Sequence, residues 1–281
     1  MKALVLGGGG VAGIAWELGV LLGVGDAQPD VVSAILEAEL VIGTSAGAAV
    51  AAQITSGVEL QELYDAQLRA ETAEIEVDLD TEVLAASYES AVRGAASTQE
   101  ARRRLGELAL TTNTVSEAQR RIAIAARLPS EVWPERRLTV TAVDTASGDL
   151  MTFTSASGVA LTDAVAASCS VPGVWPPVTI GARRYMDGGV RSSTNVDLAV
   201  GCDRVLVLLP SLPGAPSLLG DLGAQVVPPR GADVLLVRAN LRSMAAFGRN
   251  ALSPATRAAS ARAGRAVGRA KAAQVAQFWT P

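Results

Sequence analysis

The stretch Leu40-Val41-Ile42-Gly43-Thr44-Ser45-Ala46-Gly47 decides how this chain of 281 residues folds. Its short apolar run predicts a buried strand, and the small residues from Ala46 to Ile54 predict a tightly packed helix directly afterwards. Between them lies a Gly-x-Ser-x-Gly sequence, which is typical of a strained strand-to-helix turn that exposes a serine hydroxyl. Ser45 is therefore a candidate nucleophile, although a serine that caps a buried helix explains the same residues.

The sequence contains no histidine, so the base of a Ser-His-Asp triad is missing. If Ser45 is a nucleophile, a carboxylate must accept its proton. The stretch Tyr185-Met186-Asp187-Gly188-Gly189 offers one, because an acid followed by two glycines can approach another backbone segment closely. Taken alone, Asp-Gly is an ordinary tight turn. Taken with Ser45, Asp187 is the predicted base.

A glycine-rich loop follows the first apolar run, Ala3 to Leu6, and leads into a predicted helix. The N–H groups of Gly8, Gly9 and Gly10 beside the positive end of that helix form a candidate anion site. Gly8, Gly10 and Gly13 also match the Gly-x-Gly-x-x-Gly pattern of dinucleotide-binding proteins. That function requires a second strand ending in Asp or Glu about 20 residues on. The next strand runs into Gly43 instead. Glycines that only allow close strand-helix packing remain an alternative.

The three motifs together resemble patatin-like phospholipases, in the order Gly8 to Gly13, Gly43 to Gly47 and Asp187 to Gly189. The stretch from Ala166 to Gly173 also resembles that family, so the resemblance covers about residues 2–209. It implies a patatin-like fold and hydrolysis of carboxylic esters of lipids, as a phospholipase A or a general esterase. The site residues that it implies are the Ser45–Asp187 dyad, an oxyanion hole of Gly8, Gly9 and Gly10, and the motif glycines Gly13, Gly43, Gly47, Gly188 and Gly189.

One position departs from the family pattern. Patatin-like proteins often carry Arg or Lys just before the last glycine of the first motif, where this chain has Ala12. The departure predicts that the substrate is an uncharged or weakly charged ester at least as often as a phospholipid. The first 238 residues carry a formal net charge of −11, which also disfavours anionic substrates.

Other activities stay open at this point. An acyltransferase would use the same dyad and pass the acyl group to an alcohol or amine, whereas a nucleotide-binding or non-catalytic protein would not use it. We expect no cofactor and no metal, because the chain has no histidine and its acids are scattered over predicted helices. The expected partner is a lipid or small ester substrate and no nucleic acid.

Short apolar strands alternate with helical patterns, which predicts a three-layer α/β/α sandwich with a mostly parallel central sheet. The length and composition fit a single domain over residues 1–281. The candidate strands are Ala3–Leu6, Leu40–Ile42, Leu138–Val143, Met151–Thr154, Val178–Tyr185, Val205–Leu209 and Val234–Val237.

Two segments stand apart in charge. Residues 57–130 have helical patterns throughout, and within them residues 59–100 hold eleven acids against Arg69 and Arg93. This segment is a candidate cap-like insertion over an acyl groove, or a solvated helical flank. Residues 239–281 are basic, with six arginines, one lysine and no acid. Arg262, Arg265 and Arg269 share one helical face, which predicts either peripheral contact with anionic membranes or packing against the acidic remainder.

Cys169 and Cys202 are too few for a disulfide framework, so both are expected to be buried thiols in a reducing compartment. The apolar N-terminus is interrupted by four glycines and Glu17, which is unlike a signal peptide or a membrane span. We therefore expect a cytoplasmic protein. The sequence leaves the oligomeric state open.

Overall fold

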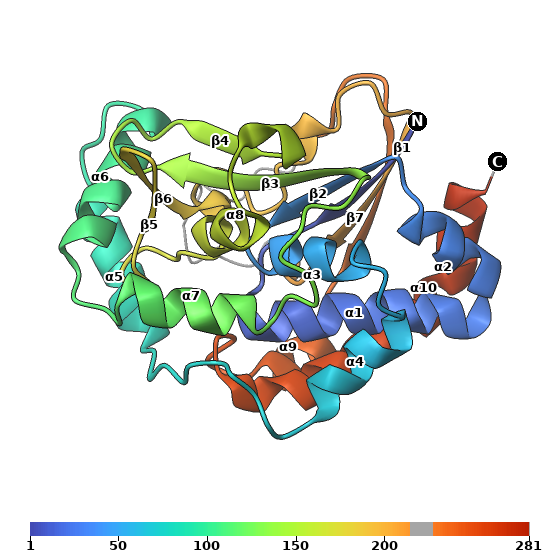
Figure 1. Ribbon diagram of the computed structural model, residues 1–281. Helices are drawn as coiled ribbons and strands as arrows, with labels where there is room; N and C mark the ends of the chain where they lie inside the picture. Colours follow the sequence, from blue (N-terminus) through green and yellow to red (C-terminus); the bar gives the residue numbers. More distant parts are fainter. Residues whose placement is uncertain (214–226, 281) are drawn as a thin grey trace.

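A mixed sheet forms the centre of the protein in the computed structural model, which describes residues 1–213 and 227–280. The strand order is β5-β6-β3-β2-β1-β7-β8, and β4 also pairs with β3 (Figure 1). Four of the seven pairings between described strands are parallel. The strands are β1 (Lys2–Leu6), β2 (Leu40–Thr44), β3 (Arg137–Asp144), β4 (Leu150–Phe153), β5 (Val178–Ile180), β6 (Arg183–Asp187), β7 (Arg204–Leu209) and β8 (Asp233–Arg238).

Helices flank this sheet, so the predicted α/β class with a mostly parallel central sheet is confirmed. Alternate side chains of β1 enter two different cores: Leu4 and Leu6 join the larger one, and Ala3 and Val5 join another on the opposite face. The helices are α1 (Gly10–Ala27), α2 (Pro29–Leu36), α3 (Ala46–Ile54), α4 (Leu60–Leu68), α5 (Thr81–Val92), α6 (Thr98–Thr111), α7 (Glu117–Ala125), α8 (Leu161–Ser168), α9 (Leu241–Phe247) and α10 (Arg257–Trp279).

One strand prediction was wrong in detail. The apolar run Val178–Tyr185 is not a single strand but an antiparallel hairpin of β5 and β6. Gly181 turns the chain with a φ of +62°, a left-handed conformation that glycine adopts without a steric penalty. The turn matters for the site because it lets β6 run back along β3 and end at Asp187.

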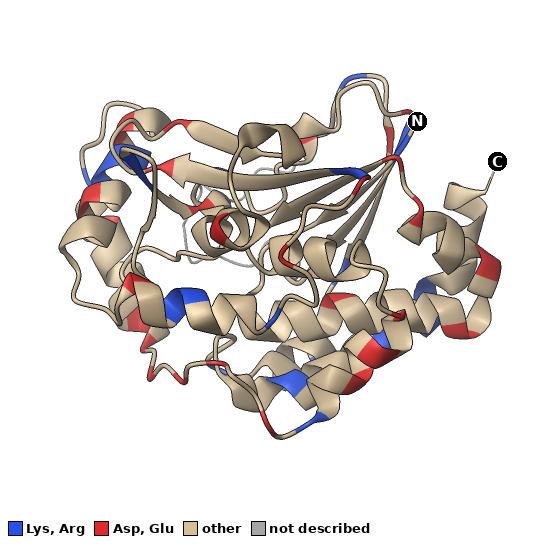
Figure 2. Cartoon of the chain, in the orientation of Figure 1, with Lys and Arg blue, Asp and Glu red and all other residues tan. Residues whose placement is uncertain are grey.

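The segment 57–130 contains α4, α5, α6 and α7 and no strand, as predicted, although residues 69–80 are irregular rather than helical. Many of its acidic residues lie along α4 and the stretch that follows (Figure 2), and others lie on α5, α6 and α7. The division of the chain into one domain with a cap-like insertion stays a prediction. Helices α5 and α6 pack Leu84, Tyr88 and Leu105 against the β3–β6 part of the sheet.

The C-terminal helix α10 lies along α1 (Figure 1) and crosses it at glycines. A Cβ atom at Gly19 would lie 2.2 Å from the carbonyl oxygen of Ala261, and one at Gly264 would lie 2.1 Å from that of Trp16. Only glycine permits this backbone approach. Among the described helices, α1 alone is long and apolar enough to cross a membrane, and 72% of it is buried inside the fold.

The basic C-terminal segment is described up to Thr280, and Pro281 lies outside the described residues. Two of its arginines face an acid of α1: Arg265 contacts Asp26 at 2.7 Å and Arg269 contacts it at 2.6 Å. Arg262 is exposed. The arrangement matches packing of this helix against the acidic remainder. Cys169 and Cys202 are buried free thiols, as predicted.

Candidate functional site

Ser45 occupies the single residue between β2 and α3. Its φ of 54° and ψ of −116° are rare for a residue with a side chain, so the surrounding structure must hold it there. Its N–H donates to Oγ of Ser168 at 2.9 Å, and its carbonyl accepts from the Cys169 thiol at 3.2 Å. The side chain is 8% exposed. The turn has the strained geometry that the Gly-x-Ser-x-Gly sequence predicts.

The two flanking glycines are required by contact. A Cβ atom at Gly43 would lie 2.5 Å from Cα of Ala48, and one at Gly47 would lie 2.1 Å from the carbonyl oxygen of Leu6. The N–H of Gly47 donates to the carbonyl of Gly7 at 3.0 Å. The turn is thereby held directly against the glycine-rich loop that follows β1.

Strand register brings Asp187 to Ser45. Thr44, the last residue of β2, lies opposite Thr141 of β3, and Asp187, the last residue of β6, lies opposite Ala142. Strand β4 pairs with the other edge of β3 at these same positions, so β2 and β6 share one edge and meet end to end. The carboxyl end of β2 and the end of β6 therefore place the serine and the aspartate side by side.

The Asp187 carboxyl group is buried, with 3% of the residue exposed. Its Oδ1 accepts the Gly189 N–H at 2.7 Å, while Oδ2 has no hydrogen-bond partner. The Ser45 hydroxyl is close enough to act on the aspartate's pKa, although no well-formed hydrogen bond joins the two side chains. Burial raises the pKa of Asp187 to about 7, against the opposing effects of the Ser45 hydroxyl, the Gly189 N–H and the Arg120 charge.

Asn195 links the strands that carry Ser45 and Asp187, and the sequence analysis did not predict this residue. Its side-chain amide donates to the hydroxyl of Thr44 at 3.0 Å, to that of Thr141 at 3.2 Å and to the carbonyl of Gly188 at 3.3 Å. The residue is fully buried and has a left-handed φ of 49°. It thus joins the ends of β2 and β3 to the loop after Asp187. No local motif marks it in the sequence.

The glycine-rich loop lies beside the serine. A Cβ atom at Gly8 would lie 3.5 Å from Cβ of Ser45. The Gly8 N–H donates to the carbonyl of Ser193 at 2.8 Å, whereas the N–H groups of Gly9 and Gly10 donate to no described residue. Gly10 begins α1, so these two groups stand at the positive end of a helix. The Gly13 N–H donates back to Gly9 at 2.8 Å and closes the first turn.

Ala12 points away from solvent, with 0% exposure, as part of the larger core. This position therefore brings no charge to the site, and the expectation of an uncharged or weakly charged ester stays a prediction. Arg120 of α7 lines the small cavity at Ser45, with its guanidinium carbon 3.7 Å from the centroid of the Trp175 ring. This cavity measures about 10 Å³, which is room for about one water molecule.

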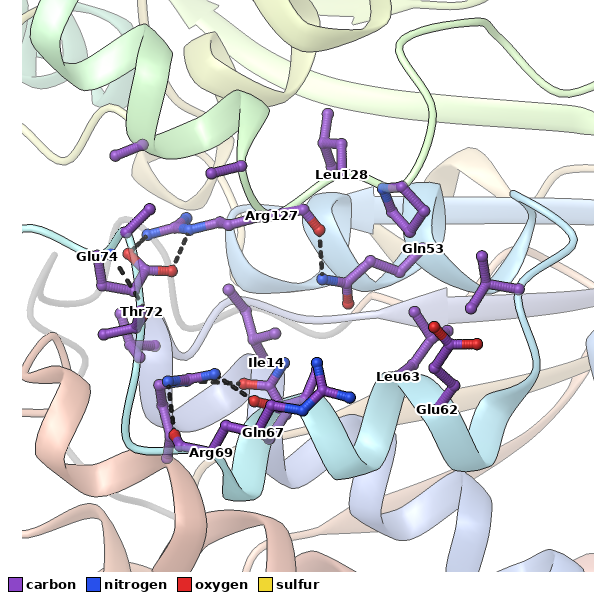
Figure 3. Close-up of a pocket in the computed structure, with 18 residues that line it drawn as sticks. Ile14, Gln53, Glu62, Leu63, Gln67, Arg69, Thr72, Glu74, Arg127 and Leu128 are labelled. Carbon is purple, nitrogen blue, oxygen red and sulfur yellow. Dashed lines mark hydrogen bonds and ion pairs between the residues drawn. The ribbon is translucent and has the colours of Figure 1, made fainter.

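A larger cavity of about 240 Å³ adjoins the first and shares Val11, Ile14 and Arg127 with it. Figure 3 shows Arg127 reaching Glu74 across this cavity; the guanidinium binds both carboxylate oxygens at 2.5 Å. The backbone carbonyl of Arg127 accepts from the Gln53 amide at 2.8 Å. The helical segment 57–130 therefore forms one wall of both cavities. Among the described residues, no three Cys, Asp or Glu side chains are grouped to hold a metal ion.

Two solved structures resemble this chain at low sequence identity. VipD from Legionella pneumophila has 12% sequence identity and a TM-score of 0.46, with the match covering 99% of this chain and 67% of VipD. The type III effector protein ExoU has 15% identity and a TM-score of 0.43, over 98% of this chain and 53% of ExoU, so the chain spans about half of that protein. No curated protein matches the sequence.

The family model described as Patatin-like phospholipase matches residues 4–200, which include the glycine-rich loop, Ser45, Asp187 and Asn195. This match covers well over half of the chain and supports lipid hydrolysis as the general class of activity. The chain belongs to the patatin-like phospholipase family.

Proposed function

We propose that this protein hydrolyses carboxylic esters of lipids with Ser45 as the nucleophile and Asp187 as the general base. The observation that carries the proposal is the strained Ser45 turn beside a buried carboxyl group whose Oδ2 has no hydrogen-bond partner. An oxygen left unpaired in a buried site is available to accept a proton. A serine with a neighbouring base is the usual arrangement for covalent acyl transfer.

In the first step, Oγ of Ser45 attacks the ester carbonyl carbon while Oδ2 of Asp187 accepts the hydroxyl proton. The N–H groups of Gly9 and Gly10 stabilise the negative charge that develops on the carbonyl oxygen. The Gly8 N–H, which the sequence also suggested for this role, is already bonded to Ser193. The alcohol then leaves with the proton from Asp187. In the second step Asp187 activates a water molecule, which releases the acyl group from Ser45.

The pKa of Asp187 suits this role. An aspartate at its ordinary pKa, about 3.9, is a weak base, and general-base catalysis is most effective when the pKa is near the working pH. Burial raises the pKa of Asp187 to about 7. The site therefore supplies a base stronger than an exposed aspartate without the missing histidine.

The larger cavity next to Ser45 is the proposed site for the acyl chain. It is lined by Val11 and Ile14 of α1 and by Leu63 and Leu128 of the helical segment, and charged side chains, among them Glu62 and Glu74, also line it. Its volume of about 240 Å³ lies below the roughly 300–1,000 Å³ of typical ligand pockets. We therefore propose that short acyl chains fit without rearrangement, and that longer ones require the helical segment to move.

The test is the Ser45→Ala variant, compared with Ser33→Ala at an exposed serine of α2. Ser45→Ala should lose labelling by a fluorophosphonate probe and should lower hydrolysis of short-chain esters and phospholipids by at least about 10³-fold. Ser33→Ala should change neither. Unchanged turnover in Ser45→Ala would show that the mechanism is wrong. Product analysis with an added alcohol acceptor separates a hydrolase from an acyltransferase with the same dyad.

A further inference from the structure

Arg120 is a buried cation with two unpaired nitrogen atoms. The residue is 3% exposed, and its Nε and Nη1 atoms have no hydrogen-bond partner. Its neighbour Arg121 is exposed and forms an ion pair with Asp163 at 2.6 Å. A buried guanidinium without partners is unfavourable, since each of its N–H groups loses its bonds to water. A buried guanidinium of this kind does not stabilise the fold by itself, but a ligand that accepts its hydrogen bonds would give it a function.

The surroundings of Arg120 provide no carboxylate of its own. Glu74 is bound on both oxygens by Arg127, and Asp187 is half-neutral near pH 7 because burial raises its pKa to about 7. Burial lowers the pKa of Arg120 to about 9, so the group is still charged at neutral pH. The stacking contact with Trp175 steadies the plane of the guanidinium and leaves its edge free to donate.

The position of Arg120 points to a function. It lines the same small cavity as Ser45 and Gly10, so a group bound to it lies close to a carbonyl held at the serine. Because this cavity has room for about one water molecule, a phosphodiester enters only when the helical segment that carries Arg120 moves outward. A guanidinium presents parallel N–H donors that match the oxygens of a phosphate group. In a glycerophospholipid the phosphodiester is separated from the ester carbonyls by only a few bonds.

We propose that Arg120, stacked on Trp175, binds the phosphodiester of the substrate and makes the site selective for phospholipids over neutral esters. This selectivity rests on the proposed function, since it concerns the substrate of the Ser45 site. It is the opposite of the uncharged or weakly charged ester that Ala12 predicts. The cation comes from α7 of the helical segment instead of from the glycine-rich loop. Residues 59–100 of that segment carry a net charge of −9 and repel anions. Arg120 therefore attracts a phosphate group only after that group has entered the cavity.

Binding is tested without turnover, in Ser45→Ala protein by calorimetry. The ligands are a short-chain phosphatidylcholine below its micelle concentration, the matching short-chain diacylglycerol, and inorganic phosphate. Adding Arg120→Gln should weaken binding of the phospholipid by about 10- to 100-fold, the usual range for losing a charge-assisted hydrogen-bond pair. Diacylglycerol binding should change little. Arg121→Gln is the matched control and should leave both affinities unchanged.

The inorganic phosphate arm distinguishes the source of the ligand. Phosphate should bind much more weakly than the phospholipid, and with the same dependence on Arg120. If phosphate binds as tightly as the phospholipid, the site is for the free anion and the proposal is overturned. Equal affinity of the parent Ser45→Ala protein for the phospholipid and the diacylglycerol also overturns it.

Kinetics provide a second readout. In the otherwise unaltered protein, Arg120→Gln should lower the ratio of kcat/KM for the phospholipid to that for the diacylglycerol by at least about tenfold, mostly through KM. Arg120→Lys, which keeps the charge but not the paired donors, should restore part of this ratio. Equal losses on both substrates would assign Arg120 to the structure or to the chemical step. If neither substrate is hydrolysed at all, the proposed function fails, while the binding measurements still decide the role of Arg120.

Discussion

The sheet edge that holds Ser45 and Asp187 and the helical segment 57–130 line the same cavity, yet they are built differently. At the edge, strand pairing and hydrogen bonds hold the backbone that carries Ser45 and Asp187. The pairing joins β2 and β6 to β3, and the hydrogen bonds come from the side chain of Asn195. The segment contacts the body through side chains: the Tyr88 hydroxyl donates to the carbonyl of Pro172, and Arg257 of α10 donates to the carbonyl of Ala66. Within the segment, the buried pair of Glu74 and Arg127 joins the irregular stretch 69–80 to the end of α7. We infer that the edge determines the chemistry and that the segment determines which ester reaches it.

The largest effect is expected at the edge, from Asp187→Asn. The variant retains the size of the side chain but cannot accept the Ser45 proton, so the hydrolysis rate should fall by about 10²- to 10⁴-fold. Initial rates on a short-chain ester measure this. Asp144→Asn and Asp163→Asn are controls, because these acids pair with Arg183 and Arg121 outside the cavity. If one of the control variants is inactive while Asp187→Asn is active, the general base is the control residue and not Asp187.

The sequence predicts the sheet edge better than the helical segment. The edge is marked by local signals: short apolar runs end in glycine turns, and each required glycine is visible in the sequence. The helical segment has no such signal. Nothing local separates Arg120 from Arg121, and only the packing of α7 against Trp175 puts one inside and the other in solvent. Asn195 was missed for a related reason, since the two threonine hydroxyls that it binds, on Thr141 and Thr44, lie 54 and 151 residues away.

The second prediction concerns the pair that joins the irregular stretch 69–80 to the end of α7 within the helical segment. Glu74→Gln leaves Arg127 buried without its charge partner, since both side chains are only 8% exposed in the pair. Breaking a buried pair in this way typically lowers the free energy of unfolding by about 3–5 kcal/mol. If the irregular stretch opens separately from the sheet, protease cleavage within residues 69–80 should accelerate already at temperatures well below the melting temperature of the variant.

Glu71→Gln is the control for this variant, because Glu71 is exposed on the same irregular stretch and forms no side-chain ion pair among the described residues. It should leave both the cleavage rate and the melting temperature unchanged. Equal protection of residues 69–80 in Glu74→Gln and the parent protein would contradict the view that this pair holds the irregular stretch in place.

The third prediction is the pH dependence of the edge. Because burial raises the pKa of Asp187 to about 7, the base is ionised only above that pH. The rate should therefore fall by about tenfold for each pH unit below 7. The sign for stability is the reverse: a carboxyl group with a raised folded-state pKa favours the folded state at low pH, and this contribution is lost as the pH rises through 7.

Asp187→Asn tests that sign directly, because asparagine stays neutral at every pH. Its melting temperature should exceed that of the parent protein at pH 8.5, at roughly 2–4 °C per kcal/mol, and the excess should be much smaller near pH 5, where Asp187 of the folded protein is neutral. A difference of the same size at both pH values would mean that the buried charge is not its cause.

The smallest effect is expected outside both regions, at Asp26, and it measures what surface charge contributes. Asp26→Asn removes the partner of Arg265 and Arg269, of which Arg269 is 57% exposed. Pairs near the surface contribute about 0–1 kcal/mol each and are screened by salt, so urea unfolding at low salt should show a loss of about 1 kcal/mol that shrinks at high salt. Lys271→Gln, which breaks no ion pair among the described residues, is the control.

Asp26→Asn also leaves Arg265 and Arg269 of α10 without their acidic partner. Binding of this variant to anionic vesicles should therefore increase if α10 contacts membranes. A loss of several kcal/mol would contradict the structure's account of α10, in which close packing at Gly19 and Gly264, rather than charge, attaches the helix to α1.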